Sequence, residues 1–232
     1  MITLNKQKAP AHNILAIETS TQVCSVALKA NTSELVKTET GKGIHSEKTF
    51  IIIDELLAEA DIKLVDVQAV VLSGGPGSYT GLRIASSAAK GLLFGREAVL
   101  YSGETLASIA AGVQRKQKTK RIHAVLDARR THLYHQLFEL NDDGILTHMS
   151  RSSVLTLSEI ESRLAKGDVV AGTGIQRLNK DLLSEHQIRT YRDDEALSAV
   201  NLLYMMKTDY FSSFVSIEDV ACYEPKYQTE ES

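Results

Sequence analysis

Residues 72–83 read LSGGPGSYTGLR, and this stretch is the most informative part of the chain. The apolar run Ala69–Leu72 predicts a strand that leads into a glycine-rich loop, and small residues over 81–91 predict a helix after it. Such a unit can bind an anion, because glycines let the backbone approach closely and the first N–H groups of a helix point at negative charge. Leu82 and Arg83 stand where a P-loop needs Lys and Ser or Thr. A tight turn with a purely structural role is the alternative.

The bulk composition is that of a globular protein with one large domain or two small ones. The chain has 232 residues, of which 43% are hydrophobic, and a net charge of −3. A protein that binds nucleic acid by itself is usually basic, so this balance counts against such a role. The N-terminal residues lack a signal-peptide core, and no apolar run approaches the roughly 20 residues of a membrane helix. We therefore expect a cytoplasmic protein without membrane contact, with Cys24 and Cys222 as buried free thiols.

The pattern strand, strand, strand, helix, strand, glycine turn, helix occurs twice. The first copy begins at Ile14–Glu18 (ILAIE) and the second at Ile122–Asp127 (IHAVLD), and each run ends in an acid. Three antiparallel strands followed by helix-connected strands form a mixed sheet covered by helices. The further predicted strands are 23–28, 34–38, 69–72, 98–101, 133–140, 145–149 and 169–171; the predicted helices are 46–60, 81–91, 106–113, 157–164, 174–183 and 197–206.

Two such units predict an α/β protein of two lobes with a cleft between them. We place the first lobe at residues 13–103 and the second at 104–232, with the last helix, 197–206, packing back on the first lobe.

Four segments together resemble the TsaB family, the accessory subunit of bacterial tRNA threonylcarbamoyladenosine synthesis. They are ILAIETSTQVCSVAL (14–28), His45-Ser46 at the start of the first long helix, LSGGPGSYTGLRIASSAAKGLLFG (72–95) and LDARRTHLY (126–134). The resemblance spans most of residues 13–227, and Glu224–Tyr227 is close to a family element. Residues 1–12 and the short acidic tail Gln228–Ser232 depart from the family pattern.

This resemblance implies the fold of the actin, hexokinase and Hsp70 ATPases, with two RNase-H-like lobes. It also implies a catalytic paralogue, TsaD, which transfers a threonylcarbamoyl group from an adenylate to an adenosine beside the tRNA anticodon. The chain itself would be a non-catalytic partner of TsaD. A TsaE-like ATPase and the tRNA would meet it only within the complex.

The candidate metal ligand and the candidate nucleophile both have structural explanations. His45 is followed four residues later by Thr49, where the catalytic paralogue has a second histidine, so we expect no metal site and a structural or capping role. Ser78 does not lie in the G-x-S-x-G elbow of a serine hydrolase.

The weak candidates for an anion or nucleotide contact lie in the glycine loop and at the strand ends. They are Ser20, Gly75, Gly77, Ser78 and Asp127. The turns after Glu18 and Asp127 match in place the two phosphate hairpins of the ATPase fold, but neither contains the glycine that such hairpins use. The two acids are therefore either simple strand ends or neighbours of a cation. We expect no cofactor, and weak ATP or ADP binding at the interface of a complex is the alternative.

The helix Ser46–Ala60 holds more apolar residues than one buried face accommodates. Either the helix is sandwiched within its own protein, or a second face meets another chain. Small residues in the helix after the glycine loop would let two helices approach closely. The residues we assign to partner binding are Phe50, Ile51, Ile52, Ile53, Leu56, Leu57, Arg83, Ser86, Ser87 and Lys90. Without its partner, the same surface would form a homodimer.

Two points stay open between alternatives. The basic run Arg115–Arg121 is either a solvated linker between the lobes or a contact to tRNA phosphates within a complex. A non-catalytic scaffold is the leading function, against a stand-alone ATPase or phosphotransferase of the same fold and, third, a peptidase.

Overall fold

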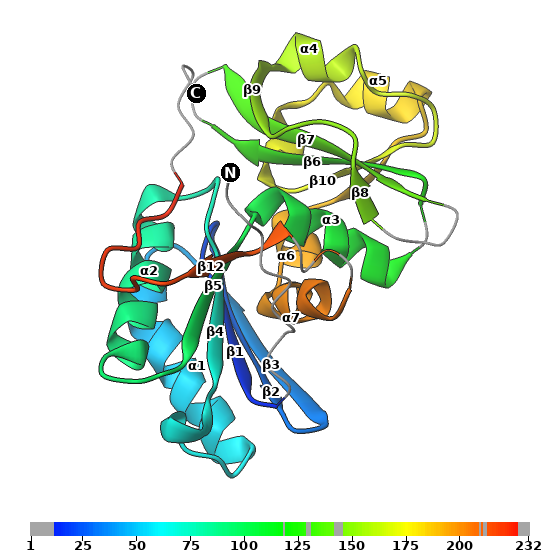
Figure 1. Ribbon diagram of the computed structural model, residues 1–232. Coiled ribbons are helices and arrows are strands. Elements are labelled where there is room, and N and C mark those ends of the chain that lie inside the picture. The colour runs from blue at the N-terminus through cyan, green and yellow to red at the C-terminus, as the bar shows by residue number, and fades with distance from the viewer. Residues whose placement is uncertain are drawn as a thin grey trace, which may run out of the picture.

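Two mixed β-sheets, one in each half of the molecule, form the frame of the computed structural model (Figure 1). The structure describes residues 12–117, 119–128, 131–141, 146–208, 210 and 213–226. Several features considered above fall outside these residues: positions 1–11, Lys118, the turn residues Arg129 and Arg130, the turn 142–145, Tyr227 and the tail 228–232.

The first sheet has the strand order β12-β5-β4-β1-β2-β3. Its strands are β1 (Ile14–Glu18), β2 (Val23–Ala30), β3 (Ser33–Thr40), β4 (Ala69–Ser73), β5 (Val99–Gly103) and β12 (Val215–Ile217). β1, β2 and β3 are antiparallel, whereas β1, β4 and β5 are parallel. β1 and β4 are buried along their whole length, which explains why both read as continuous apolar runs.

The second sheet repeats this order as β11-β10-β6-β7-β8, with β9 paired to β7. Its strands are β6 (Arg121–Asp127), β7 (His132–Leu140), β8 (Leu146–His148), β9 (Ser153–Thr156), β10 (Val169–Ala171) and β11 (Arg189–Tyr191). β6 takes the place of β1, with an antiparallel neighbour on one side and a parallel neighbour on the other. The repeated unit predicted from the sequence is confirmed.

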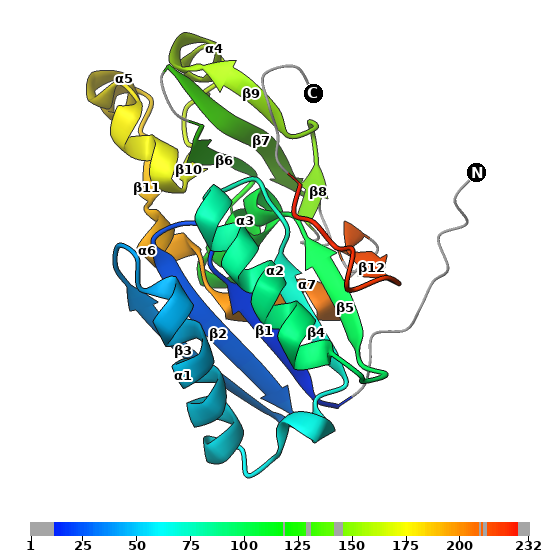
Figure 2. The same ribbon diagram turned by 90° about the vertical axis from the view of Figure 1, so that its left-hand side faces the viewer.

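Helices cover both faces of each sheet. They are α1 (His45–Glu59), α2 (Tyr79–Leu93), α3 (Thr105–Lys116), α4 (Leu157–Glu161), α5 (Lys180–Glu185), α6 (Asp193–Ala196) and α7 (Ala199–Lys207), with 3-10 turns η1 (Leu64–Asp66) and η2 (Thr173–Arg177). α1 and α2 lie side by side on the outer face of the first sheet (Figure 2), and α7 packs on its inner face. α3 packs on the inner face of the second sheet, and α4 and α5 on its outer face.

The chain after residue 197 contributes to the first sheet: α7 packs against β1 and β2, and β12 pairs with β5. The lobe boundaries given above stay a prediction. Three short strands, β9, β11 and β12, were not predicted. The helix predicted over 174–183 is instead η2 followed by α5, because Leu178 is extended and Asn179 caps a new helix. Cys24 is buried as predicted, but Cys222 is exposed, because it lies in the C-terminal segment that runs over the surface.

Two histidines face each other inside the second lobe, on the outer side of its sheet. His123 of β6 and His135 of β7 are both fully buried, and Nδ1 of His123 lies 3.0 Å from Nε2 of His135. Nε2 of His123 lies 3.0 Å from Oδ2 of Asp168. A neutral His123 that donates to Asp168 accepts a hydrogen bond from His135. Burial lowers the pKa of His135 to about 3. Burial also lowers the pKa of His123, although Asp168 opposes the shift.

This pair makes the second lobe sensitive to acid. The pKa of His135 is lower in the folded protein than the value of about 6.5 in an unfolded chain, so protonation favours the unfolded state. Stability is therefore complete above pH 6.5 and falls as the pH decreases toward 3, by up to about 1.4 kcal/mol per pH unit for each proton taken up. Urea unfolding between pH 4.5 and 7.5 measures this slope. His135→Gln should reduce it, while His12→Gln at the exposed His12 should leave it unchanged. Equal slopes for both variants would contradict the assignment.

Candidate functional site

The glycine loop between β4 and α2 is packed against the turn that joins β1 and β2. A Cβ atom at Gly81 would lie 1.9 Å from the carbonyl oxygen of Thr19, and one at Gly77 would lie 2.5 Å from that of Ser20. The backbone N–H of Ser78 donates to the Ser20 carbonyl at 2.7 Å, and the Thr19 hydroxyl donates to the Gly81 carbonyl at 2.8 Å. The two turns therefore touch backbone to backbone, which only glycine permits.

The first half of the loop is held by two other segments. A Cβ atom at Gly74 would lie 2.0 Å from the Ser102 hydroxyl, and one at Gly75 would lie 2.4 Å from the Lys226 carbonyl. The N–H of Lys226 donates to the Gly74 carbonyl at 2.8 Å, and that of Thr105 donates to the Gly75 carbonyl at 3.0 Å. Gly75 has a φ of +116°, a region that favours glycine. These contacts support the structural alternative for the loop.

Glu18, at the end of β1, is fully buried and its carboxylate is used within the protein. Oε1 accepts the Ser20 backbone N–H at 2.8 Å, and the Ser73 hydroxyl donates to Oε2. Burial raises the pKa of Glu18, and these hydrogen bonds oppose the shift. Both carboxylate oxygens are already partnered, so Glu18 is an acid that closes the turn at the strand end.

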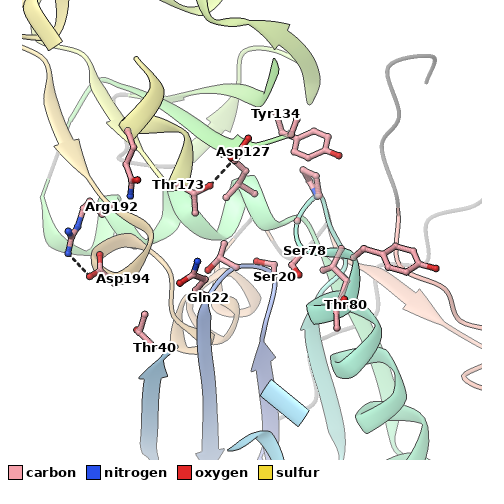
Figure 3. Close-up of a pocket in the computed structure, with 18 of the residues that line it drawn as sticks. Ser20, Gln22, Thr40, Ser78, Thr80, Asp127, Tyr134, Thr173, Arg192 and Asp194 are labelled. Atoms are coloured by element: carbon pink, nitrogen blue, oxygen red, sulfur yellow. Dashed lines mark hydrogen bonds and ion pairs between the residues drawn. The ribbon is translucent and has the colours of Figure 1, made fainter. Parts of the chain in front are cut away.

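A cleft of about 890 Å³ lies between the two lobes (Figure 3). Its lining is rich in hydroxyl and amide groups and is shared by Ser20, Thr21, Gln22, Thr40, Pro76, Gly77, Ser78, Tyr79, Thr80, Leu82, Leu126, Asp127, Ala128, Tyr134, Thr173, Gln176, Arg192, Asp194 and Lys226. Four of the five predicted anion contacts meet here, from both lobes. The fifth, Gly75, does not line the cleft, because the C-terminal segment covers it.

On the second-lobe side, Asp127 is already paired. Its Oδ1 accepts from Arg177 at 2.7 Å, and its N–H donates to the Thr173 hydroxyl at 2.9 Å. The N–H of the next residue, Ala128, donates to the His132 carbonyl at 3.3 Å. The N–H groups of Ser20 and Ala128, in the two turns that match phosphate hairpins in place, thus both have acceptors within the protein.

The surface of α1 divides the predicted partner residues into two groups. Phe50 and Ile51 are 46% and 41% exposed. The other four α1 residues that we assigned to partner binding are buried, and these are Ile52, Ile53, Leu56 and Leu57. The assignment of these four is corrected: α1 contacts β2 and β3 as well as α2, so its buried stripe is wider than one helix face.

The same division holds on α2. Arg83 and Ser87 are exposed and Lys90 is half-buried. Ser86 is buried beneath the C-terminal segment, where its hydroxyl donates to the Tyr223 carbonyl at 3.5 Å. Its assignment to partner binding is therefore corrected as well. The Arg83 guanidinium lies 5.1 Å from the centre of the Tyr79 ring, at the end of the helix next to the cleft.

His45 and Arg115, the first residue of the basic run, make contacts within the protein. Nε2 of His45 lies 3.3 Å from the Val23 carbonyl, inside the first lobe. No group of three or more His, Cys, Asp or Glu side chains that could hold a metal occurs in the described part of the chain. Arg115 donates to Asn201 at 2.9 Å, and the run ends α3 and begins β6. Arg115, Lys116 and Lys120 are exposed and Lys118 lies outside the described residues, so both predicted roles of the run stay predictions.

Several cleft residues were not singled out from the sequence. Thr173 and Gln176 come from η2, and Lys226 enters from the C-terminal segment. The glycine turn at 172–174, which occupies in the second lobe the place of the glycine loop, was the signal for the first two. No sequence signal marked Lys226, because its position depends on a long return of the chain.

Two RNase-H-like lobes around a cleft define a protein of the actin-like ATPase class. The family model of TsaD, tRNA N6-adenosine threonylcarbamoyltransferase, matches residues 36–171. The Escherichia coli tRNA threonylcarbamoyladenosine biosynthesis protein TsaB is 32% identical over 166 residues, which cover 70% of this chain and 72% of that one. The solved structure of YeaZ from Pseudomonas aeruginosa is 26% identical, with a TM-score of 0.75 over 94% of this chain and all of that one. The chain belongs to the TsaB family.

A more distant likeness is to the catalytic transferase itself. The tRNA N6-adenosine threonylcarbamoyltransferase of one Staphylococcus epidermidis strain is 35% identical over 98 residues, which cover 35% of this chain and 29% of that one. Within the described ranges, no helix is both long and apolar enough to cross a membrane.

The packing of the glycine loop gives a paired test. Gly81→Ala should destabilise the protein by about 2–3 kcal/mol, because its methyl group would overlap the Thr19 carbonyl. Gly91→Ala, in the same helix but with open space at its Cβ, should be neutral or stabilise by up to about 1 kcal/mol. Urea unfolding measures both. Equal effects would show that the loop has room to adapt.

Proposed function

We propose that this chain is a non-catalytic partner subunit in the synthesis of threonylcarbamoyladenosine in tRNA, and that it pairs with a TsaD-like catalytic paralogue. Membership of the TsaB family supports the pathway, and the match to the TsaD family model supports a paralogue of the same fold. A TsaE-like ATPase and the tRNA meet this chain only through that complex. The observation that carries the partner role is the exposed apolar pair Phe50 and Ile51 on α1.

The partner surface consists of the exposed residues Phe50, Ile51, Arg83 and Ser87 and of the half-buried Lys90, on α1 and α2. The two helices lie side by side (Figure 2). On the exposed face of α2, Ser87 and the neighbouring Gly91 are small residues that project little from the helix. A paralogue of the same fold presents the equivalent pair of helices. Two such pairs can form a four-helix contact, in which small residues allow close approach.

Charge is divided between these helices in a way that also suits self-association. Glu47 and Asp54 are exposed on α1, whereas Arg83 and Lys90 are on α2. A two-fold axis that sets α1 of one copy against α2 of another would bring opposite charges together. We therefore propose a homodimer through the same surface when the paralogue is absent.

The geometry supports the non-catalytic role over the two enzyme alternatives. An ATPase would need carboxylates free to act near a phosphate, but Glu18 and Asp127 are both paired within the protein. A peptidase would need an activated nucleophile, but the Ser78 hydroxyl accepts the Gly81 N–H at the start of α2. Ser78 is thus a helix cap.

Ile51→Glu tests the partner surface. A charge placed at the centre of a desolvated contact should weaken association by about 3 kcal/mol, more than a hundredfold in Kd. Val36→Glu is the matched control, since Val36 is 44% exposed but lies on β3 rather than on α1 or α2. Titration calorimetry with the purified TsaD-like paralogue and a reconstituted tRNA modification assay measure the two effects. If Ile51→Glu keeps full affinity and full support of modification, the interface lies elsewhere.

A second role is weak binding of ATP or ADP in the cleft, favoured by one observation. Lys226 lines the cleft together with several hydroxyl-bearing residues near the start of α2, where helix N–H groups attract anions. Lys226→Ala should weaken nucleotide binding about tenfold, as expected for the loss of one charged contact, whereas the exposed Lys166→Ala should not. Calorimetry with ADP, alone and in the presence of the paralogue, decides. Equal affinity for both variants would place the nucleotide elsewhere.

A further inference from the structure

One buried asparagine joins the two lobes. Asn201, in the first turn of α7, is 1% exposed. Its Nδ2 donates to the Ala196 carbonyl at 2.8 Å and to the Ser108 carbonyl at 3.1 Å. Its Oδ1 accepts from the Arg115 guanidinium at 2.9 Å. A single side chain therefore connects α7 to both ends of α3 and to the end of α6.

These helices belong to different lobes. α7 packs on β1, β2 and β4 of the first sheet, whereas α3 packs on β6, β7 and β10 of the second. The contact between α3 and α7 is therefore the joint between the lobes, and one continuous apolar core runs through it from Ala16 in β1 to Ala124 in β6.

At this joint α3 lies so close to the chain before α7 that no side chain fits at position 112. A Cβ atom at Gly112 would lie 1.8 Å from the Ala196 carbonyl and 2.7 Å from Nδ2 of Asn201. The backbone of α3 thus rests directly on the chain between α6 and α7. Lys116 adds a further tie at the surface, where its ammonium group donates to the Glu195 carbonyl.

The start of α7 is also fixed to the first lobe. The N–H of Ala199 donates to the Ser25 hydroxyl of β2 at 3.1 Å, and that hydroxyl lies 2.8 Å from the hydroxyl of Thr38 on β3. Asn201, two residues after Ala199, is hydrogen-bonded to α3. The first turn of α7 is therefore held from both lobes, which leaves it no free rotation.

We propose that Asn201 is the positioning residue of an interlobe lock, which holds the cleft at one width. Actin-like ATPases with a free joint could close on a ligand by a hinge or shear motion of the lobes. Here a buried amide with three partners and a glycine without room for a Cβ oppose both motions. The consequence is that the α2 end at the cleft and the Asp127 turn opposite keep a constant separation.

A distance measurement across the cleft tests the lock. Spin labels on the exposed residues Lys42 and Lys180, each changed to Cys with Cys222→Ser, report on the interlobe distance, and a pair at Lys42 and Lys63 within the first lobe gives the rigid reference. Cys24 is buried and remains unlabelled. The lock predicts one interlobe peak as narrow as the reference, unchanged by magnesium and ATP. A broad peak, or a shift to shorter distance with ATP, would overturn it.

Variants assign the effect to the side chain. Asn201→Ala and Asn201→Asp both remove the two donated bonds and should broaden the interlobe peak or add a second one at longer distance. Asn179→Ala is the control, because the Asn179 side chain also makes two hydrogen bonds to the backbone, here by accepting two N–H groups, but only within α5. Narrow peaks in both folded Asn201 variants would refute the proposal. If neither folds, the width of the wild-type peak decides.

Discussion

The backbone contact between Gly81 and Thr19 is the constraint on which the rest of the first lobe depends. It brings the start of α2 so close to the turn after β1 that no side chain fits between the two backbones. The same loop receives the C-terminal segment through Lys226 and the start of α3 through Thr105. Three segments that are distant from it in the sequence therefore meet at one glycine loop. A stretch that reads as an anion site is used here to hold backbones together.

The two turns that correspond in place to phosphate hairpins are held by contacts within the protein. A phosphate hairpin works by leaving backbone N–H groups open toward the ligand. Here the N–H groups of Ser20 and Ala128 bind groups within the protein, and the Glu18 carboxylate closes its own turn. The Ser20 and Ala128 N–H groups and both Glu18 carboxylate oxygens are thus satisfied within the protein, whereas the buried Ser20 hydroxyl has no hydrogen-bond partner.

The sequence predicted the elements that carry strong local patterns. The fully buried strands β1 and β4, the strand β6 with its buried middle, the helix α1 and the repeated order were all visible as apolar runs and periodicity. The strands β9, β11 and β12 have only three or four residues each, and they pair with β7, β10 and β5, which belong to the predicted pattern. Cys222 and Lys226 could not be placed either, since their surroundings come from a return of the chain to the first lobe.

The candidate partner surface shows the same limit at the level of single residues. The excess of apolar residues on α1 correctly indicated more than one buried direction, but most of that excess faces α2 and the sheet of the same lobe. Only the three-dimensional position of α1 separates Ile51, which is exposed, from Ile52, which is 2% exposed. A periodic pattern gives the direction of each side chain around the helix axis. Which of these directions are buried depends on the elements that pack against the helix. The apolar surface that α1 leaves exposed is therefore small. Among the described residues of α1, only Phe50 and Ile51 are large, apolar and exposed. We propose that Arg83 and Lys90 of α2 add specificity to a contact of this size, because charged residues around an apolar centre select the partner.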